Sequence, residues 1–273
     1  MSPTTSGPCE IDDIGSTAKN NPTNTSQGFL LMNADDWGRD RQTTDRILDC
    51  CANGSVSSAS AMVFMEDSER AAVLALEHGL EVGLHLNFTT PFSASVCSTA
   101  LIEHQQRTAR HLLRHRLSQA VFHPGLVRSF EYLVKAQLDE FQRIYQKDPA
   151  KIDGHHHMHL CANVMLQGLL PPGFIVRRSF SFEVGEKSFW NRAYRKLMDR
   201  TLSRRHRLPD FFFSLPPLEP PQRLERIYSL ARQCTVELET HPINADEYRY
   251  LMSGEMLRHT SNLRIAGPSA LAQ

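Results

Sequence analysis

Four histidines stand within five residues of this 273-residue chain, in the run from Asp153 to His159 (DGHHHMH). Imidazole is the commonest protein ligand for zinc-like ions, and catalytic zinc sites use a few side chains and leave one position for water or substrate. The run is internal and lies between the apolar residues Ile152 and Leu160, so it is not an expression tag. Its composition favours a bound divalent metal, with a solvated or hydrogen-bonded histidine loop as the alternative.

A pair of adjacent carboxylates, Asp35 and Asp36, follows the apolar run from Phe29 to Met32. Successive side chains at the exit of a strand point in different directions, so one carboxylate can bind a metal while the other stays free. A free carboxylate beside a metal-bound water could take the proton of that water. The alternative is a structural role, in which the pair forms an Asx turn or caps the next helix.

Two further histidines lie in or after predicted strands. His85 is in the stretch 81–87, where its apolar neighbours alternate away from it, and His241 follows the stretch 236–240. Alone, His85 would more often be a hydrogen-bonded core residue. Together with the acidic pair and the histidine run, it completes a set of one carboxylate and two imidazoles, which suits a hydrolytic zinc-type site.

The elements that position these groups are typical of an α/β protein. Strands at 29–32, 58–64 and 81–87 alternate with helices at 43–53 and 66–78, which indicates parallel strands covered by helices. Ligands bind at the carboxyl ends of such strands, where these polar groups lie. The elements predicted further along are a helix at 125–146, strands at 150–154 and 174–177, a basic helix at 187–202 and a strand at 236–240.

The overall composition limits the classes of partner. Thirty Lys and Arg balance thirty Asp and Glu, so no global charge favours nucleic acid or an anionic membrane. The basic stretch from Arg192 to Arg207 is interpreted as the solvated face of a helix, because no aromatic interleaving accompanies it. Six cysteines without a CxxC pair suit a reducing compartment, so we expect a cytoplasmic protein.

One α/β domain is expected to account for most of the chain. Residues 1–28 are rich in Ser, Thr, Asn, Pro and Gly, contain no apolar run long enough for a signal peptide or a membrane span, and are expected to be a disordered lead. The domain is predicted to span 29–262, with an insertion at about 91–123, and 263–273 is predicted to be a C-terminal tail. The oligomeric state is left open, with a homodimer as one alternative.

Four segments, in order, resemble the motifs of the YdjC-type (ChbG-like) carbohydrate deacetylases. They are 33–38 (NADDWG), 82–89 (VGLHLNFT), 152–159 (IDGHHHMH) and 239–242 (ETHP). The resemblance covers about residues 29–260. It implies a distorted (β/α) barrel related to the polysaccharide deacetylases, and an enzyme that removes acetyl groups from N-acetylated sugars, including chitooligosaccharides.

The resemblance also implies a role for each residue of the motifs. The implied metal ligands are Asp36, His85 and His155. Asp35 becomes the general base and His241 the candidate general acid. Two other histidines of the run, His157 and His159, are reserve ligands, or they orient the metal ligands or contact sugar. The cofactor is expected to be one divalent ion, with zinc as the first choice and magnesium or manganese as alternatives.

Three residues are expected to contact the substrate, namely Trp37, Asn87 and Arg177. Trp37 stands where the family commonly has Phe, and its broader ring could stack on a sugar face. Arg177 and Arg178 follow a predicted strand, so a guanidinium there could bind a carboxylate, a phosphate or a sugar hydroxyl, unless the pair is exposed and solvated. The region 93–121 fits the family pattern poorly and is rich in Arg and His. Segments of this kind shape the substrate cleft, so the resemblance does not fix which sugar this chain would accept.

The leading hypothesis is therefore a metal-dependent hydrolase acting on an N-acetyl group of a small saccharide or glycoconjugate. A sugar-binding or metal-binding barrel that has lost turnover is one alternative. A metallophosphoesterase with one metal is another. A test of N-acetyl sugars against phosphate esters separates these alternatives.

Overall fold

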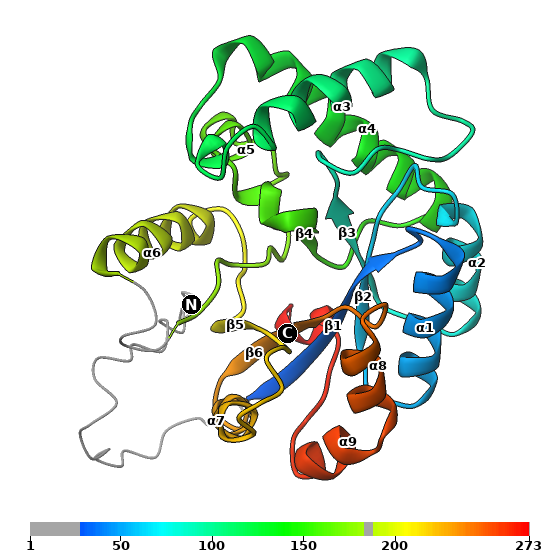
Figure 1. The fold of residues 1–273 in the computed structure, drawn as a ribbon, viewed down its shortest axis with the longest axis vertical. Coiled ribbons are helices and arrows are strands. Elements are labelled where there is room, and N and C mark those ends of the chain that lie inside the picture. The colour runs from blue at the N-terminus through cyan, green and yellow to red at the C-terminus, as the bar shows by residue number, and fades with distance from the viewer. Residues whose placement is uncertain (1–27, 183–187, 273) are drawn as a thin grey trace, which may run out of the picture.

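Residues 28–182 and 188–272 are described by the computed structural model, and they form a parallel α/β fold. The strands form one sheet in the order β4-β3-β2-β1-β6-β5, and every neighbouring pair is parallel. The strands are β1 (Phe29–Trp37), β2 (Ser58–Ala61), β3 (Val82–Leu86), β4 (Ile152–Gly154), β5 (Phe211–Ser214) and β6 (Thr235–Thr240). Figure 1 shows the strands at the centre of the molecule with helices around them. The predicted parallel α/β class is confirmed.

The segment from Phe174 to Ser181 joins the two edges of this sheet. Its backbone forms hydrogen bonds of 2.8 and 3.0 Å with Ile152 of β4 on one side, and one of 2.8 Å with Phe212 of β5 on the other. The strand predicted at 174–177 is present as isolated bridges at Ile175 and Val176. These bonds bring the curled sheet close to the expected distorted barrel.

Side chains alternate along the strands: apolar residues face outward against the helices, and polar residues face the inside of the barrel. In β6, Val236 and Leu238 belong to the hydrophobic core, whereas Glu237 accepts a hydrogen bond of 2.6 Å from the Lys151 ammonium. Lys151 directly precedes β4, and three strands separate β4 from β6 in the sheet. The contact between Lys151 and Glu237 therefore crosses the inside of the barrel.

A glycine in β3 makes room for this buried lysine. A Cβ atom on Gly83 would lie 2.6 Å from Cγ of Lys151 and 2.8 Å from the Lys151 carbonyl oxygen. Both distances are shorter than van der Waals contact, so a side chain at position 83 would displace the lysine. The missing side chain of Gly83 thus allows a cation to enter the barrel.

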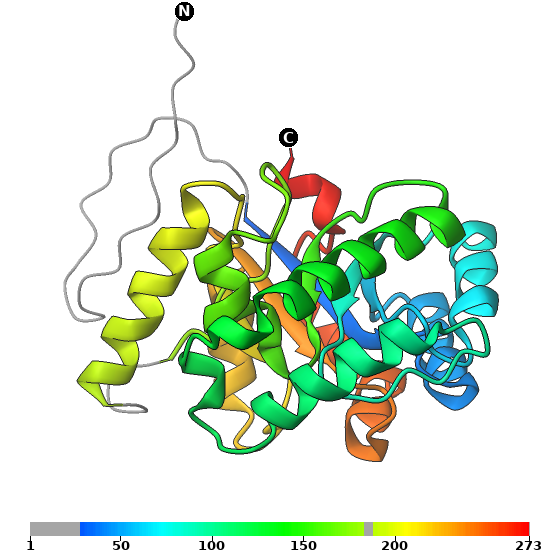
Figure 2. The same ribbon diagram turned by 90° about the horizontal axis from the view of Figure 1, so that it is seen from above.

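Helices cover the outside of the barrel, and Figure 2 shows them surrounding the strands. They are α1 (Arg41–Ala52), α2 (Ser68–Glu77), α4 (Val127–Tyr145), α5 (Ala162–Gln167), α6 (Phe189–Ser203), α7 (Gln222–Leu230), α8 (Ala245–Met252) and α9 (Glu255–Thr260). The side chain of Asp40 caps α1 by accepting a hydrogen bond of 2.8 Å from the Thr43 backbone N–H. Asp40, rather than the Asp35-Asp36 pair, therefore caps this helix.

The region predicted as an insertion, 91–123, contains one long helix, α3 (Thr99–Leu112), and the short 3-10 helix η1 (Ser118–Ala120). Ser98 caps α3, because its hydroxyl accepts a hydrogen bond of 3.2 Å from the Leu101 backbone N–H. The helix packs on α4 with buried residues that include Leu101 and Leu112. This packing gives the region an ordered place against the barrel.

The two ends of the chain differ in what the structure describes. The predicted N-terminal lead, except for Gly28, lies outside the described residues. Near the other end, Arg264 and Ala266 form backbone hydrogen bonds of 2.8 and 3.1 Å with Leu30 of β1, so this part of the predicted tail packs on the barrel. Within 28–182 and 188–272, no helix combines the length and the apolar character that crossing a bilayer requires.

Candidate active site

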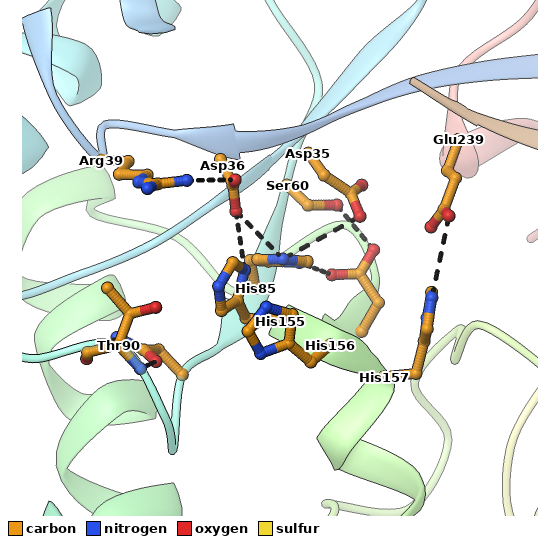
Figure 3. A network of polar contacts seen from close by, with 12 residues as sticks. Asp35, Asp36, Arg39, Ser60, His85, Thr90, His155, His156, His157 and Glu239 are labelled. Carbon is orange, nitrogen blue, oxygen red and sulfur yellow. Dashed lines mark hydrogen bonds and ion pairs between the residues drawn. The ribbon is translucent and has the colours of Figure 1, made fainter. Parts of the chain in front are cut away.

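Three residues from different elements meet at the carboxyl end of β1. Asp36 is the second-to-last residue of β1, and His85 lies in β3. His155 is the first residue of the 3-10 segment η3 (His155–Leu160), which follows β4. The Asp36 Oδ1 atom lies 3.0 Å from His155 Nδ1 and 3.4 Å from His85 Nε2. Figure 3 shows the three side chains pointing toward one another. We call this group the Asp36 cluster.

The backbone at Asp36 explains how two adjacent carboxylates reach the same site. Asp36 has a φ of 71°, and the register of β1 against β2 shifts between Ala34 and Trp37. In a regular strand, Asp35 and Asp36 would point to opposite faces. The left-handed residue and the irregular register turn both carboxylates inward, and such strained residues are typical of functional sites.

The Asp36 cluster fits a metal ion. Its three donor atoms all lie within 4.8 Å of one another, and all three residues are buried. The Asp36 Oδ1 atom faces both imidazole nitrogens without a well-aligned hydrogen bond from any of the described residues, and a buried carboxylate oxygen is costly to leave in this way. One carboxylate and two imidazoles around such an atom form a donor set that suits zinc and leaves room for a water molecule.

Asp153 sets the orientation of His85. The His85 Nδ1 atom lies 2.7 Å from Asp153 Oδ1, so Nε2 is the nitrogen that faces Asp36. Burial opposes the charged imidazole, but the carboxylates of Asp35 and Asp153 raise the pKa of His85 to about 10. A carboxylate that holds a histidine in this way is typical of metal sites. The sequence alone gives no role to Asp153, which pairs with His85 in the register of β3 and β4.

A second group of possible ligands, Asp35, His85 and Asp153, lies beside the first. Both Asp35 oxygens accept hydrogen bonds from Arg177, at 2.7 and 2.6 Å. Asp153 accepts hydrogen bonds from Ser60 at 2.6 Å and from Lys151 through the oxygen that does not face His85. The carboxylates of this second group are already satisfied by the protein, so the Asp36 cluster is the better metal site.

Arg177 lies at the centre of a buried ionic network. Besides its paired bonds to Asp35, its Nε atom donates to Glu237 at 2.7 Å and its terminal nitrogen donates to Glu239 at 3.2 Å. A further nitrogen lies 3.1 Å from Asp153. We call Arg177 and the residues that share these bonds the Arg177 network, namely Lys151, Asp153, Asp35, Glu237 and Glu239.

Arg177 and Arg178 were predicted either to enter the site or to be exposed and solvated, and the structure places the two residues differently. Arg177 is fully buried and enters the site, where its guanidinium binds carboxylates of the protein. Arg178 is partly exposed and binds Asp199 of α6 at 2.8 Å. Neither arginine is a free, solvated cation.

The Arg177 network gives its carboxylates different proton affinities. Burial disfavours charge on Asp35, but Arg177 and then His85 overcome this effect and hold the pKa of Asp35 well below its ordinary value. Burial and the charge on Asp35 raise the pKa of Glu239 to about 8, although Arg177 opposes the shift. Asp35 is therefore ionised at neutral pH, whereas Glu239 retains a proton.

The remaining imidazoles of the run lie outside the Asp36 cluster. His156 Nδ1 is 3.1 Å from the Thr89 hydroxyl, and His157 Nε2 is 3.7 Å from Glu239. His159 Nε2 lies 3.0 Å from the Arg177 carbonyl oxygen, and burial lowers the pKa of His159 to about 4, so this ring is neutral and donates to the carbonyl. His156 and His157 both have left-handed backbones, with φ of 54° and 56°, which turn the four rings in different directions.

Trp37 and Asn87 are both buried behind the residues of the site and do not face its opening. Trp37 is fully buried in the core, so its ring offers no face to a sugar, and the expectation that it stacks on substrate is not supported. Asn87 is also fully buried, and its side chain donates to the Thr90 carbonyl at 2.7 Å and accepts from the Thr89 and Thr90 backbone N–H groups. Asn87 therefore holds the loop that carries Thr89 toward His156.

His241 directly follows β6, next to β1. The register pairs Thr240 with Ala34, which places His241 level with Asp35 at the same rim. Its backbone N–H donates to Glu247 at 2.8 Å, and the residue is partly exposed. Within the described residues, its imidazole forms no hydrogen bond or ion pair with the Asp36 cluster.

The chain is similar in sequence to curated proteins named chitooligosaccharide deacetylase. It is 28% identical over 139 residues to the protein from Yersinia pestis (strain Pestoides F), a match that covers 50% of this chain and 52% of that one. It is 28% identical over 159 residues to the protein from Escherichia fergusonii, covering 58% and 57% respectively. The chain thus spans about half the length of the curated relatives it matches.

The fold is shared with a crystal structure of a candidate cellobiose-phosphate cleavage protein from Enterococcus faecalis V583. The TM-score is 0.65 at 16% identity, and the match covers 91% of this chain and 100% of that one. At this identity the likeness concerns the fold alone. The model of the YdjC-like proteins matches residues 29–260, which include every residue of the Asp36 cluster and the Arg177 network. The chain therefore belongs to the YdjC-like protein family.

Proposed function

We propose that this protein is a metal-dependent hydrolase that removes an acetyl group from an N-acetylated saccharide. The observation that carries the proposal is the buried Asp36 Oδ1 atom, on which two imidazole nitrogens converge at 3.0 and 3.4 Å. The similarity to chitooligosaccharide deacetylases supports the substrate class. Family membership supports the choice of Asp36, His85 and His155 as ligands.

Zinc is the proposed ion, because one carboxylate and two imidazoles suit it; magnesium and manganese are alternatives. When bound, a divalent ion would lower the pKa of a water molecule and polarise the acetyl carbonyl oxygen. Asp153 would keep His85 in the orientation that faces the ion. His159 and His157 remain reserve ligands, although the structure gives each of them another neighbour.

Asp35 is the proposed general base. It lies next to Asp36, its Oδ2 atom is 3.9 Å from His85 Nε2, and Arg177 keeps it ionised. A carboxylate held in this way can accept a proton from an attacking water without moving. Arg177 would then position the base, and its part in substrate binding would be indirect.

His241 is the proposed general acid for the leaving amine. It stands at the rim beside Asp35, is partly exposed, and its imidazole has no bond to the cluster that would restrain it. A cytoplasmic location remains a proposal from the cysteine pattern.

Acetate release from N-acetylglucosamine oligomers tests the proposal. The protein is depleted of metal, reloaded with zinc, magnesium or manganese, and assayed against these oligomers and against phosphate esters. We expect acetate release that depends on the metal, and no phosphate release. Phosphate release alone would favour a metallophosphoesterase, whereas saccharide binding without acetate release would favour a non-catalytic binding protein.

A further inference from the structure

The outer face of α6 carries large apolar side chains that no described part of the chain covers. Phe189, Trp190, Tyr194 and Leu197 are 67%, 80%, 44% and 62% exposed. Scattered exposed apolar residues are common on proteins, but four within nine residues of one helix form a patch. Exposed apolar patches of this kind mark sites where a protein binds another molecule or a membrane.

Cations accompany these residues on the same helix. Lys196 and Arg200 are exposed, and Arg204 follows directly after the end of α6, so these three lie four residues apart along the side next to Leu197. The sole acidic residue of α6 is Asp199, which is buried. Among the described residues of α6 itself, the outer face is therefore apolar and positively charged and carries no acidic side chain.

The inner face of α6 is anchored beside the candidate active site. Asp199 binds Arg178 and accepts a hydrogen bond of 2.8 Å from the Ser179 hydroxyl. The guanidinium of Arg195 lies 4.9 Å from the ring centre of Phe182. Figures 1 and 2 show α6 at the margin of the molecule, on the side away from α1 and α2. The helix is thus held by one face and presents the other outward.

An aromatic path connects this helix to the histidine run. The ring of Phe182 lies 6.2 Å from that of Phe180, whose ring lies 4.6 Å from that of His157. The inner face of α6 therefore packs on the segment that forms this wall of the site. Docking through α6 would bring the active site to its substrate if the substrate lay on the same surface.

We propose that α6 docks the protein on an anionic lipid surface. Helices that lie on membranes combine Trp, Phe and Leu with Lys and Arg, because the apolar side chains enter the boundary of the bilayer while the cations meet anionic headgroups. A second copy of this chain is a poorer partner, since two α6 faces would bring like charges together. In this proposal the basic stretch 192–207 binds a lipid surface instead of facing only solvent. The aromatic side chains on the same helix are Phe189, Trp190 and Tyr194.

The protein contains its own probe for this docking. It has two tryptophans, and Trp37 is fully buried whereas Trp190 is exposed. The full chain is mixed with vesicles of phosphatidylcholine, with or without phosphatidylserine, at low and high salt. We expect the Trp emission to shift to the blue and to resist acrylamide quenching only with phosphatidylserine at low salt. Absence of any shift or of co-flotation with these vesicles would overturn the proposal.

Two variants separate docking from unspecific adhesion. Leu197→Glu combined with Arg200→Glu alters only exposed positions of α6, and should weaken binding to phosphatidylserine vesicles at least about tenfold, since one charge near such a surface is worth roughly fivefold. Leu76→Glu, at an 81% exposed position of α2, is the control for placing a glutamate on an exposed apolar position elsewhere, and it should bind like the wild type. Circular dichroism confirms that each variant is folded.

Three results would contradict the proposal. Equal loss of vesicle binding in the Leu76→Glu control would show that α6 is not the docking element. Binding to an RNA oligomer with no binding to vesicles would assign the face to nucleic acid. A concentration-dependent dimer that the α6 variant abolishes, without vesicle binding, would assign it to a second copy. Because vesicle binding needs no catalysis, the outcome is independent of whether the protein releases acetate.

Discussion

The Asp36 cluster and the Arg177 network lie side by side in the barrel, yet they differ in how their polar atoms are satisfied. In the Arg177 network, each carboxylate has a cation beside it, and both oxygens of Asp35 accept hydrogen bonds from the guanidinium. In the Asp36 cluster, Oδ2 accepts a hydrogen bond of 3.1 Å from Arg39, whereas Oδ1 faces the two imidazole nitrogens without a well-aligned hydrogen bond from the described residues. The guanidinium of Arg177 therefore holds both oxygens of Asp35, while one oxygen of Asp36 is left facing the two imidazoles.

This difference supports the separate tasks proposed for the two groups. As the proposed general base, Asp35 must be unprotonated and held in position, and the closed network supplies both conditions. As the proposed metal site, the Asp36 cluster supplies converging donor atoms. His85 and Asp153 connect the two, because His85 faces Asp36 through one nitrogen and Asp153 through the other.

The largest expected effect comes from removing the centre of the network. Arg177→Met leaves Asp35 buried without its cation and leaves Glu237 with Lys151 alone, so we expect the free energy of unfolding to fall by about 3–5 kcal/mol. Urea unfolding of the metal-free proteins measures the change. Arg178→Met, at a partly exposed position, is the matched control and should cost about 1 kcal/mol. A loss for Arg177→Met no larger than that of the control would show that the network does not stabilise the barrel.

A smaller effect is expected where the two groups join. Asp153→Asn keeps the shape of the side chain but removes the charge that orients His85, so metal affinity should fall about 10- to 100-fold. Competition with a chelating dye measures the dissociation constant. Glu239→Gln serves as the comparison, because Glu239 belongs to the network without touching His85, and it should change the affinity far less. If both variants lose affinity equally, Asp153 has no special link to the metal ligand.

A third test follows the stability of the metal-free protein with pH. Burial and Asp35 raise the pKa of Glu239 from 4.5 to about 8, so the folded chain keeps a proton that the unfolded chain loses between these values. The stability of the metal-free protein should therefore fall as pH rises through this window, with a contribution of about 1.4 kcal/mol per pH unit from this group.

Glu239→Gln isolates this contribution, because an amide has no proton to lose. Urea unfolding of the wild type and the variant across the window compares the two slopes. The slope for the variant should lack the fall assigned to Glu239. Parallel pH profiles would mean that Glu239 is not the group that retains the proton.

Much of this arrangement was predictable from local sequence. Apolar runs followed by acidic residues or histidine gave β1, β3, β4 and β6, and the rim of a parallel sheet brought Asp36, His85 and His155 together as expected. The helix prediction at 125–146 matches α4, because its apolar residues recur at helical spacing.

The polar interior was harder to predict, because it depends on contacts across the barrel. The alternation of Lys151 with Asp153, and of Glu237 with Glu239, is visible in the sequence as charges two residues apart in apolar strands. Sequence alone does not show that β4 and β6 face each other and share Arg177. The short strand β5 was also missed, since its four residues lie between Pro209 and Pro216, which resemble loop signals.

The most direct test of the account compares two isosteric changes at adjacent positions. Metal content and acetate release are measured for Asp35→Asn and Asp36→Asn after both proteins are loaded with zinc and freed of excess ion. We predict that Asp35→Asn keeps one ion per chain and loses about 10²- to 10⁴-fold in turnover, whereas Asp36→Asn loses the ion and all acetate release. A fully active Asp35→Asn enzyme, or an Asp36→Asn protein that retains its ion, would contradict the division between the Arg177 network and the Asp36 cluster.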